Sequence, residues 1–230
     1  MTDVTTNQKG DKYIDSYLSP MRIDWSKIEA VILDLGGVIL DIDYHLTINA
    51  FKDLGISNFE DQYSKKVQSG LFDLLETGKI SASEFYHEMR TVNTSMTDEQ
   101  IQQAWNAMLL DFPHGRLEFL QQIKKRYPLF LLSNTNEIHL TEFTKTLQRH
   151  GHGNLSLFFD KVYLSHEIGQ RKPNREAFEL ILKEQGLTPE NTLFVDDSEQ
   201  HITGARSIDI QAYHLEAPET LEQLFSPVLA

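Results

Sequence analysis

The chain of 230 residues contains no cysteine. This absence excludes disulfide bonds, zinc sites built on thiolates and catalysis by a cysteine nucleophile. The sequence also lacks any apolar run long enough to cross a bilayer, and the polar stretch Met1–Lys12 has no apolar core of the kind found in signal peptides. We therefore expect a cytoplasmic protein without a membrane partner.

Basic residues are scarce, because 21 lysines and arginines stand against 34 aspartates and glutamates and leave a net charge of −13. Binding to nucleic acid requires a basic footprint for the phosphate backbone, so no nucleic-acid partner is expected. A small phosphorylated ligand needs only a local patch of positive charge. The composition therefore leaves a small phosphorylated metabolite open as a binding partner.

Short apolar runs alternate with longer amphipathic stretches along most of the chain. This alternation predicts βαβ units and an α/β fold whose core is a Rossmann-like parallel sheet. The expected strands are Val31–Asp34, Leu129–Ser133, Lys161–Leu164, Leu193–Asp196 and Ala212–Leu215. The helices expected between them are Leu117–Arg126, Glu137–Gln148, Arg175–Gln185 and Gln200–Ser207.

Residues 43–112 interrupt this alternation, because they contain helical patterns and no convincing strand. Ser81 with Glu84 and Thr97 with Gln100 form the pattern of a capping box, in which a helix begins. We predict an inserted helical cap at 43–112, which could cover the strand ends as a lid. The α/β core would then comprise 25–42 and 113–230.

Residues 1–24 precede the expected core and leave two alternatives. Tyr13, Ile14, Tyr17 and Leu18 could form a short helix on the surface. A partly disordered N-terminal arm explains the polar composition at least as well.

Four polar sites stand out, and three of them fall at the ends of expected strands. They are Asp34, Ser133-Asn134-Thr135-Asn136, Lys172 and the pair Asp196-Asp197. Ligands of open parallel sheets bind at the carboxyl ends of the strands, so these side chains are expected to converge. Taken singly, each has an ordinary explanation as a turn residue, a helix cap or a solvated lysine. Their common position favours a functional site.

Convergence would bring three carboxylates together, which costs roughly 4 kcal/mol for each pair at ~4 Å and an effective dielectric constant near 20. All three can stay ionised only if a cation lies among them, and Mg²⁺ prefers oxygen ligands of this kind. Lys172 adds a positive charge, and Ser133 adds a hydroxyl and backbone N–H groups that can bind an anion. Such a site could neutralise a phosphate, so that a carboxylate can attack its phosphorus.

The four sites together resemble the ordered motifs of the haloacid dehalogenase-like (HAD) superfamily. The matching segments are Asp34-Leu35-Gly36-Gly37-Val38, Ser133-Asn134-Thr135-Asn136, Arg171-Lys172-Pro173 and Asp196-Asp197. The expected helical insertion is similar to the α-helical cap of that superfamily. A closer resemblance, to bacterial α-D-glucose-1-phosphate phosphatases, rests on Asp34-Leu35-Gly36-x-Val38-Ile39-x-Asp41-Ile42-Asp43, Leu132-Ser133-Asn134-Thr135-Asn136 and Tyr163-Leu164-Ser165.

The resemblance implies a role for each site residue. Asp34 would be the nucleophile, and Lys172 would bridge the nucleophile and the phosphate. Mg²⁺ would be bound by Asp34, the backbone carbonyl of Gly36 and Asp197, with Asp196 either as a further ligand or as a residue that orients the others. Substrate contacts would come from Gly37, Ser133, Asn134 and His45, although an exposed position on a helix explains His45 somewhat better.

One position departs from the pattern of the superfamily. Most of its phosphatases carry a second aspartate two residues after the nucleophile, where it serves as general acid, but this chain has Gly36 there. Loss of a general acid typically costs ~10²–10⁴ in rate. The enzyme could be slow, or Asp41, Asp43 or His45 could substitute, or the substrate could need little acid assistance. A sugar 1-phosphate, whose leaving group is an acidic anomeric hydroxyl, would satisfy the last alternative.

We therefore expect a Mg²⁺-dependent phosphomonoesterase that acts on a small phosphorylated metabolite, a sugar phosphate, through a phospho-aspartyl intermediate. A 2-haloacid dehalogenase is one alternative, because it also uses an aspartate nucleophile. A non-catalytic phosphate- or metabolite-binding protein is another, suggested by Gly36. Phosphotransfer of the mutase type is disfavoured, because the second aspartate is missing.

Overall fold

The computed structural model describes residues 23–56 and 70–229, so the expectations for an N-terminal arm fall almost entirely outside the described residues. Five parallel strands form one sheet in the order β3-β2-β1-β4-β5. The strands are β1 (Ala30–Leu33), β2 (Leu129–Ser133), β3 (Lys161–Leu164), β4 (Thr192–Asp196) and β5 (Gln211–His214). The expectation of a parallel α/β fold is confirmed.

The central strands form because their side chains are buried on both faces of the sheet. All residues of β1, β2 and β4 are buried, as expected for continuous apolar runs in a parallel sheet. Successive side chains alternate between the faces, so Val31 and Leu33 join one apolar cluster and Ala30 and Ile32 join the other. Asp34 directly follows β1 and therefore lies at its carboxyl end.

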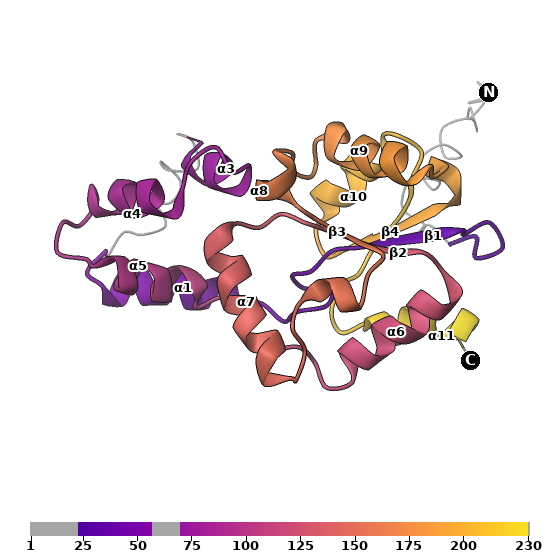
Figure 1. Cartoon of the computed structure of the whole chain (residues 1–230), viewed down its shortest axis with the longest axis horizontal. Helices are drawn as coiled ribbons and strands as arrows, with labels where there is room; N and C mark the ends of the chain where they lie inside the picture. The colour runs from indigo at the N-terminus through magenta and orange to yellow at the C-terminus, as the bar shows by residue number, and fades with distance from the viewer. Residues whose placement is uncertain (1–22, 57–69, 230) are drawn as a thin grey trace, which may run out of the picture.

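Helices cover both faces of the sheet (Figure 1). One face packs against α6 (Arg116–Arg126), α7 (Glu137–Arg149) and α11 (Leu221–Leu229), and the other packs against α9 (Arg175–Gln185) and α10 (Glu199–Arg206). The helix α11, which contains Pro227, was not predicted from the sequence. The core also contains three short elements: α8 (Ser165–Ile168) and the 3₁₀ helices η1 (Leu155–Leu157) and η2 (Pro189–Asn191).

Four helices lie between β1 and α6 in the described part of the chain, and we call this segment, residues 44–106, the helical insertion. They are α1 (Tyr44–Asp53), α3 (Leu71–Glu76), α4 (Ala82–Arg90) and α5 (Asp98–Asn106). The two predicted capping boxes are present at the starts of α4 and α5. The insertion has its own apolar cluster, whose largest members are Phe51, Phe72, Phe85 and Trp105.

The chain enters and leaves the insertion through two paired segments, which we call the neck. The backbone N–H of Asp43 donates to the carbonyl of Met108 at 2.9 Å, and Asp41 and Leu110 are joined by an N–H···O bond of 3.0 Å. Ile42 and Leu109 form an antiparallel bridge between these bonds. The neck lies near the domain boundaries expected at 43 and 112, and we retain that division as a proposal.

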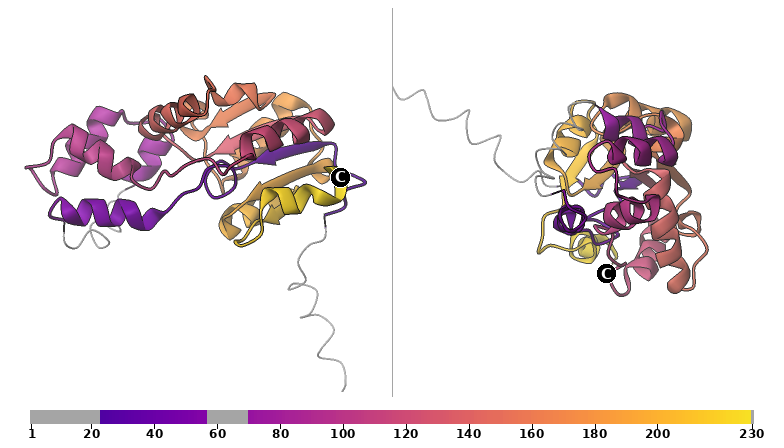
Figure 2. Two further views of the ribbon diagram at one scale, coloured as in Figure 1. Left: turned by 90° about the horizontal axis from the view of Figure 1, so that it is seen from below. Right: turned by 90° about the vertical axis from the view of Figure 1, so that its left-hand side faces the viewer.

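The insertion projects from one end of the sheet and contacts the core on two sides (Figure 2). On one side, Asn106 of α5 bonds through Oδ1 to Nδ1 of His139 on α7 at 2.8 Å, and Trp105 stacks on the same imidazole ring. On the other side, Arg171 pairs with Asp73 and Glu76 of α3. Within the described ranges, no helix combines the length and apolarity that crossing a bilayer requires.

Candidate active site

Asp34 lies at the carboxyl end of the central strand, where its backbone N–H still donates to the carbonyl of Val195 on β4 at 2.9 Å. This bond fixes the start of the loop that follows β1. The Asp34 side chain is 10% exposed, and its Oδ1 lies 2.7 Å from Nζ of Lys172. The sheet therefore presents one carboxylate beside one ammonium group at a nearly dry position.

Lys172 is fully buried and is held at both ends. Its Nζ also lies 2.6 Å from Oδ2 of Asp196, which is the last residue of β4. The side-chain amide of Asn134 binds the Lys172 backbone twice: Nδ2 donates to the carbonyl at 2.9 Å, and Oδ1 accepts from the N–H at 2.9 Å. The Asn134 side chain thus positions the lysine. The backbone N–H of Asn134 is a candidate hydrogen-bond donor to a phosphate.

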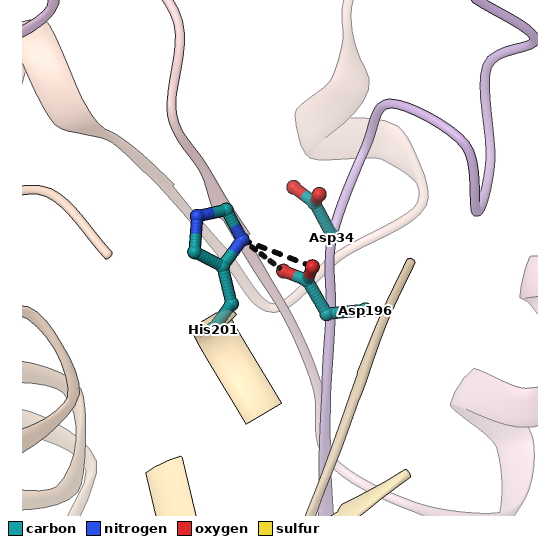
Figure 3. Close-up of side chains that lie close together, drawn as sticks. All are labelled: Asp34, Asp196 and His201. Atoms are coloured by element: carbon teal, nitrogen blue, oxygen red, sulfur yellow. Dashed lines mark hydrogen bonds and ion pairs between the residues drawn. The ribbon is translucent and has the colours of Figure 1, made fainter. Parts of the chain in front are cut away.

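Asp196 is saturated with hydrogen bonds, which indicates an orienting role. Its Oδ1 accepts from the backbone N–H of Ser198 at 2.8 Å, and Nδ1 of His201 lies 3.0 and 3.1 Å from its two oxygens. Figure 3 shows the His201 ring facing the Asp196 carboxylate, with Asp34 beside it. His201 lies on α10 and belongs to none of the sequence motifs. Its imidazole ring holds the Asp196 carboxylate in place.

The charges of the site are not balanced by protein groups alone. Burial raises the pKa of Asp34, and the negative charge of Asp196 adds to this effect against the opposing charge of Lys172. Burial alone would lower the pKa of Lys172, but the two carboxylates outweigh burial and raise it. Burial and the charge of Asp196 also raise the pKa of Asp197. One ammonium group therefore faces three carboxylates.

This donor set fits a divalent cation. Ligand atoms of Asp34, Asp196 and His201 all lie within 4.8 Å of one another, and Asp197 approaches the same loop from β4. A Cβ on Gly37 would overlap the Asp197 carboxylate, so the glycine lets that carboxylate approach the backbone after Asp34. Hard oxygen donors of this kind suit Mg²⁺, whereas an imidazole ligand suits transition metals better. His201 therefore fits the role of a partner for Asp196 better than that of a Mg²⁺ ligand.

A cavity of about 760 Å³ opens above this cluster, between the sheet and the helical insertion. Its core side is polar and contains Asp34, Ser133, Asn134 and Asp197. Its opposite side, formed by the neck and the insertion, is mainly apolar and contains Ile42, Ile48, Trp105, Met108 and Leu109. The cavity thus offers an anion-binding end and an apolar end that could enclose a small molecule.

The chain matches the sequence model of a known protein family. Residues 28–209 match the model of the haloacid dehalogenase-like hydrolases, which covers all four motifs. The chain belongs to this family. The resemblance to the HAD superfamily, and with it the prediction of a hydrolase, is confirmed.

Several characterised relatives of this HAD hydrolase are phosphatases. The D-ribitol-5-phosphate phosphatase of Bacteroides thetaiotaomicron is 32% identical over 195 residues, 82% of this chain and 92% of the relative. The sesquiterpene phosphatase of Aspergillus oryzae is 25% identical over 194 residues, 81% of this chain and 89% of the relative. The more specific resemblance to glucose-1-phosphate phosphatases stays a prediction.

Solved structures of HAD enzymes share the fold over most of its length. A HAD enzyme of B. thetaiotaomicron, solved as the wild-type protein with magnesium and inorganic phosphate, has a TM-score of 0.79 and 34% identity, with 86% of this chain and 99% of that chain covered. A predicted HAD-like hydrolase of Porphyromonas gingivalis has a TM-score of 0.78 and 31% identity, with 88% and 98% covered. The first of these shows that a related HAD fold binds both magnesium and phosphate.

The structure brings together most of the predicted site residues, but the three candidates for replacing an acid at Gly36, Asp41, Asp43 and His45, do not line the cavity. His45 is exposed, and its backbone N–H donates to Asp43, which caps α1. Asp41 and Asp43 flank Ile42 in the paired neck, where alternate side chains point in opposite directions. Because Ile42 faces the cavity, none of these three is placed to replace an acid at Gly36.

Glu76 and Trp105 are among the cavity residues of this HAD hydrolase that were not predicted as site residues. Glu76, the last residue of α3, lines the cavity and pairs with Arg171 at 3.0 Å. Trp105 lines it from α5, between the rings of Phe72 and His139. The signal for Glu76 was weak: it ends the short helix α3, just before the turn at Gly78 and a few residues before the predicted capping box. Only the packing of the insertion brings it near Lys172.

Proposed function

We propose that this protein is a Mg²⁺-dependent phosphomonoesterase that acts on a small phosphorylated metabolite of the sugar or polyol class. The observation that carries this proposal is the pairing of Asp34 with the buried ammonium of Lys172 beside Asp196, at the polar end of the cavity. The phosphatase relatives support the reaction class. The D-ribitol-5-phosphate phosphatase, at 32% identity, supports the sugar or polyol class.

In the proposed reaction, Oδ of Asp34 attacks the substrate phosphorus and displaces the alcohol. Lys172 holds the attacking carboxylate and the phosphoryl oxygens together, so negative charge can be brought to a negative centre at a low cost in repulsion. Ser133 is buried at the end of β2 and lines the cavity, where its hydroxyl can donate to a phosphoryl oxygen. Water then attacks the phosphorus of the phospho-aspartyl group and restores Asp34.

Asp34, the carbonyl of Gly36 and Asp197 would hold Mg²⁺, with Asp196 orienting the cluster through its bonds to Lys172 and His201. A bound Mg²⁺ supplies positive charge that compensates the carboxylates and the phosphate. The excess of carboxylates over ammonium groups at this site supports a divalent rather than a monovalent cation. The relative solved with magnesium and phosphate supports the same assignment.

The test is a phosphatase screen of the purified protein with Mg²⁺ and with EDTA. Ribitol 5-phosphate, glucose 1-phosphate, glucose 6-phosphate and chloroacetate form the panel, and inorganic phosphate and halide are measured. We expect Mg²⁺-dependent phosphate release and no halide. Halide release in EDTA would instead identify a dehalogenase, and tight phosphate binding without turnover of any ester would identify a binding protein.

The same screen separates the substrate classes. A preference for glucose 1-phosphate over glucose 6-phosphate would support the view that an acidic anomeric leaving group compensates for Gly36. A preference for the 6-phosphate or for ribitol 5-phosphate would refute that view. It would require a protein group that donates a proton to the leaving oxygen.

The apolar side of the cavity, formed by the neck and the insertion, favours a second candidate substrate, the monophosphate of an apolar alcohol. Trp105, Met108 and Leu109 would contact the hydrocarbon part of such a substrate. The sesquiterpene phosphatase relative gives the candidate a precedent. Farnesyl monophosphate added to the panel tests it: a kcat/KM above that of every sugar phosphate would favour this class over the first.

A further inference from the structure

The proposed function leaves one chemical requirement unassigned, because an alkoxide leaving group needs a proton when its bond to phosphorus breaks. The side chains that line the cavity in the described part of the chain include seven with ionisable groups. They are Asp34, Tyr44, Glu76, His139, Arg171, Asp197 and His201. A general acid and base must be a group among these that can donate a proton to the alcohol oxygen and later accept one from water.

Most of these groups are committed elsewhere. Asp34 and Asp197 are assigned to attack and metal binding, and Nδ1 of His201 faces Asp196. His139 is engaged with Asn106 at 2.8 Å, and burial lowers its pKa to about 3, so it carries no proton to donate near neutral pH. Arg171 keeps its proton at any pH at which the protein is folded. Tyr44 is 60% exposed at the start of α1.

Glu76 differs from all of them in its position. It ends α3 of the insertion and faces the cavity from the side opposite the sheet. Its Oε2 lies 3.0 Å from Nη2 of Arg171, the residue that precedes Lys172. This ion pair holds the carboxyl group at the boundary between the insertion and the core, where it lines the cavity.

The surroundings of Glu76 also suit proton transfer. Burial raises its pKa to about 7, while the positive charge of Lys172 acts in the opposite direction. The other ionisable groups near α3 are Asp73 on the same helix, Arg171, and His166 on α8, which packs against α3. A carboxyl group whose pKa is near the working pH can donate a proton in one step and accept one in the next.

We propose that Glu76 is the general acid and base of this hydrolase, supplied by the insertion in place of an acid at Gly36. The inference rests on the proposed phosphatase function. In the first step, the bond from Asp34 to phosphorus forms, the bond from phosphorus to the alcohol oxygen breaks, and the proton of Glu76 moves to that oxygen. In the second step, water attacks phosphorus, its proton moves to Glu76, and Asp34 leaves as a carboxylate with inorganic phosphate as product.

Glu76→Gln tests this role, because glutamine keeps the shape and a polar oxygen beside Arg171 but cannot transfer a proton. With the best alkyl phosphate of the panel, we expect kcat/KM to fall by about 10²-fold or more. With p-nitrophenyl phosphate, whose phenolate leaves without a proton, we expect kcat/KM to fall by less than about 10-fold. The p-nitrophenol time course should show a burst, and phosphorylated Asp34 should accumulate in acid-quenched samples, because the second step lacks its base.

Asp73→Asn is the matched control. Asp73 lies on the same helix and pairs with the same Arg171, but it does not line the cavity. We expect kcat/KM with both substrates to stay within about 3-fold of the wild type. Glu76→Asp, which retains a titratable carboxyl group, should be more active on the alkyl phosphate than Glu76→Gln.

Equal losses with the alkyl and aryl phosphates, without a burst, would overturn the proposal and reduce Glu76 to a residue that holds the insertion in place. A loss in Asp73→Asn as large as that in Glu76→Gln would have the same meaning. Failure of the proposed function has a different appearance, since the wild-type protein would then hydrolyse neither kind of ester.

Discussion

Nζ of Lys172 lies 2.7 Å from Oδ1 of Asp34, and the two groups meet from a loop before α9 and the carboxyl end of β1. Neither group could be buried alone, because an isolated charge in a dry environment is strongly unfavourable. The positive charge of Lys172 stabilises the buried carboxylate of Asp34, and that carboxylate in turn keeps the Lys172 side chain protonated. The first two predictions follow from this pair.

Asp34→Asn should abolish phosphatase activity, with a loss of more than about 10³-fold in kcat/KM, because the amide cannot act as the nucleophile. The substitution also removes one negative charge from a cluster that holds more carboxylates than ammonium groups. In EDTA we therefore expect the Asn variant to unfold at a higher temperature than the wild type. Differential scanning calorimetry with and without Mg²⁺ measures both states, and Mg²⁺ should stabilise the wild type more than the variant.

Lys172→Met should lose activity and also destabilise the fold by about 3–5 kcal/mol, because it leaves Asp34 and Asp196 buried without their cation. Urea unfolding at neutral pH in EDTA gives the free energy. Lys124→Met serves as the control, since that lysine forms a half-exposed pair with Asp160 and should change stability by less than about 1 kcal/mol. Equal effects of the two substitutions would contradict the importance of the buried cluster.

Gly37→Ala should impair activity more than stability. Gly37 has a φ of 71°, and a Cβ there would overlap the Asp197 carboxylate. Gly115→Ala is a matched control, because Gly115 has a φ of 78° but nothing lies within 4 Å of the added Cβ. Both variants should lose about 1–2 kcal/mol from backbone strain. Only Gly37→Ala should also need a higher Mg²⁺ concentration for half-maximal activity.

His139 should make the fold sensitive to mild acid. Burial lowers its folded-state pKa to about 3, from an ordinary value of 6.5, so below pH 6.5 the unfolded state binds a proton that the folded state does not. The corresponding stability is fully present above pH 6.5 and is lost as the pH falls toward 3, at about 1.4 kcal/mol for each pH unit.

His139→Gln removes this titration and can keep the bond to Asn106. Between pH 7 and pH 5, the free energy of unfolding of the wild type should therefore fall by about 2 kcal/mol more than that of the variant. Urea unfolding at the two pH values gives the difference, in which the contributions of the other titratable groups cancel. Parallel changes in the two proteins would show that the folded protein accepts a proton at His139.

The sequence predicted the core more accurately than it predicted the insertion. Leu129–Ser133 and Arg175–Gln185 were placed to the residue, since long apolar or amphipathic runs have a clear period. The C-terminal helix α11 was missed, although its apolar side chains pack on the sheet beside α6. Pro227 and the short length of this helix weaken its local signal, and its stability comes from tertiary burial.

For the site, Asp34, Ser133 and the pair Asp196-Asp197 could be predicted because they stand at strand ends, and strand ends of a parallel sheet share one edge. The sequence left open whether Asp196 binds the metal or orients the other groups. Asp196 and Asp197 are adjacent in sequence, but only the structure shows that the first is held by Lys172 and His201. The second faces the loop after Asp34. Successive side chains at a strand end point in opposite directions, so their roles diverge.

The sequence by itself determined the order of the strands along the chain, the place of the insertion and the identity of the acid and the lysine at the centre of the site, because these depend on local patterns. Only the tertiary structure decided which group of the insertion faces that centre. His45 and Asp43 lie close to Asp34 in sequence and turn away, whereas Glu76 is distant and lines the cavity. The direction of a side chain on a helix or in a paired neck depends on what packs against it, and that information is absent from local sequence.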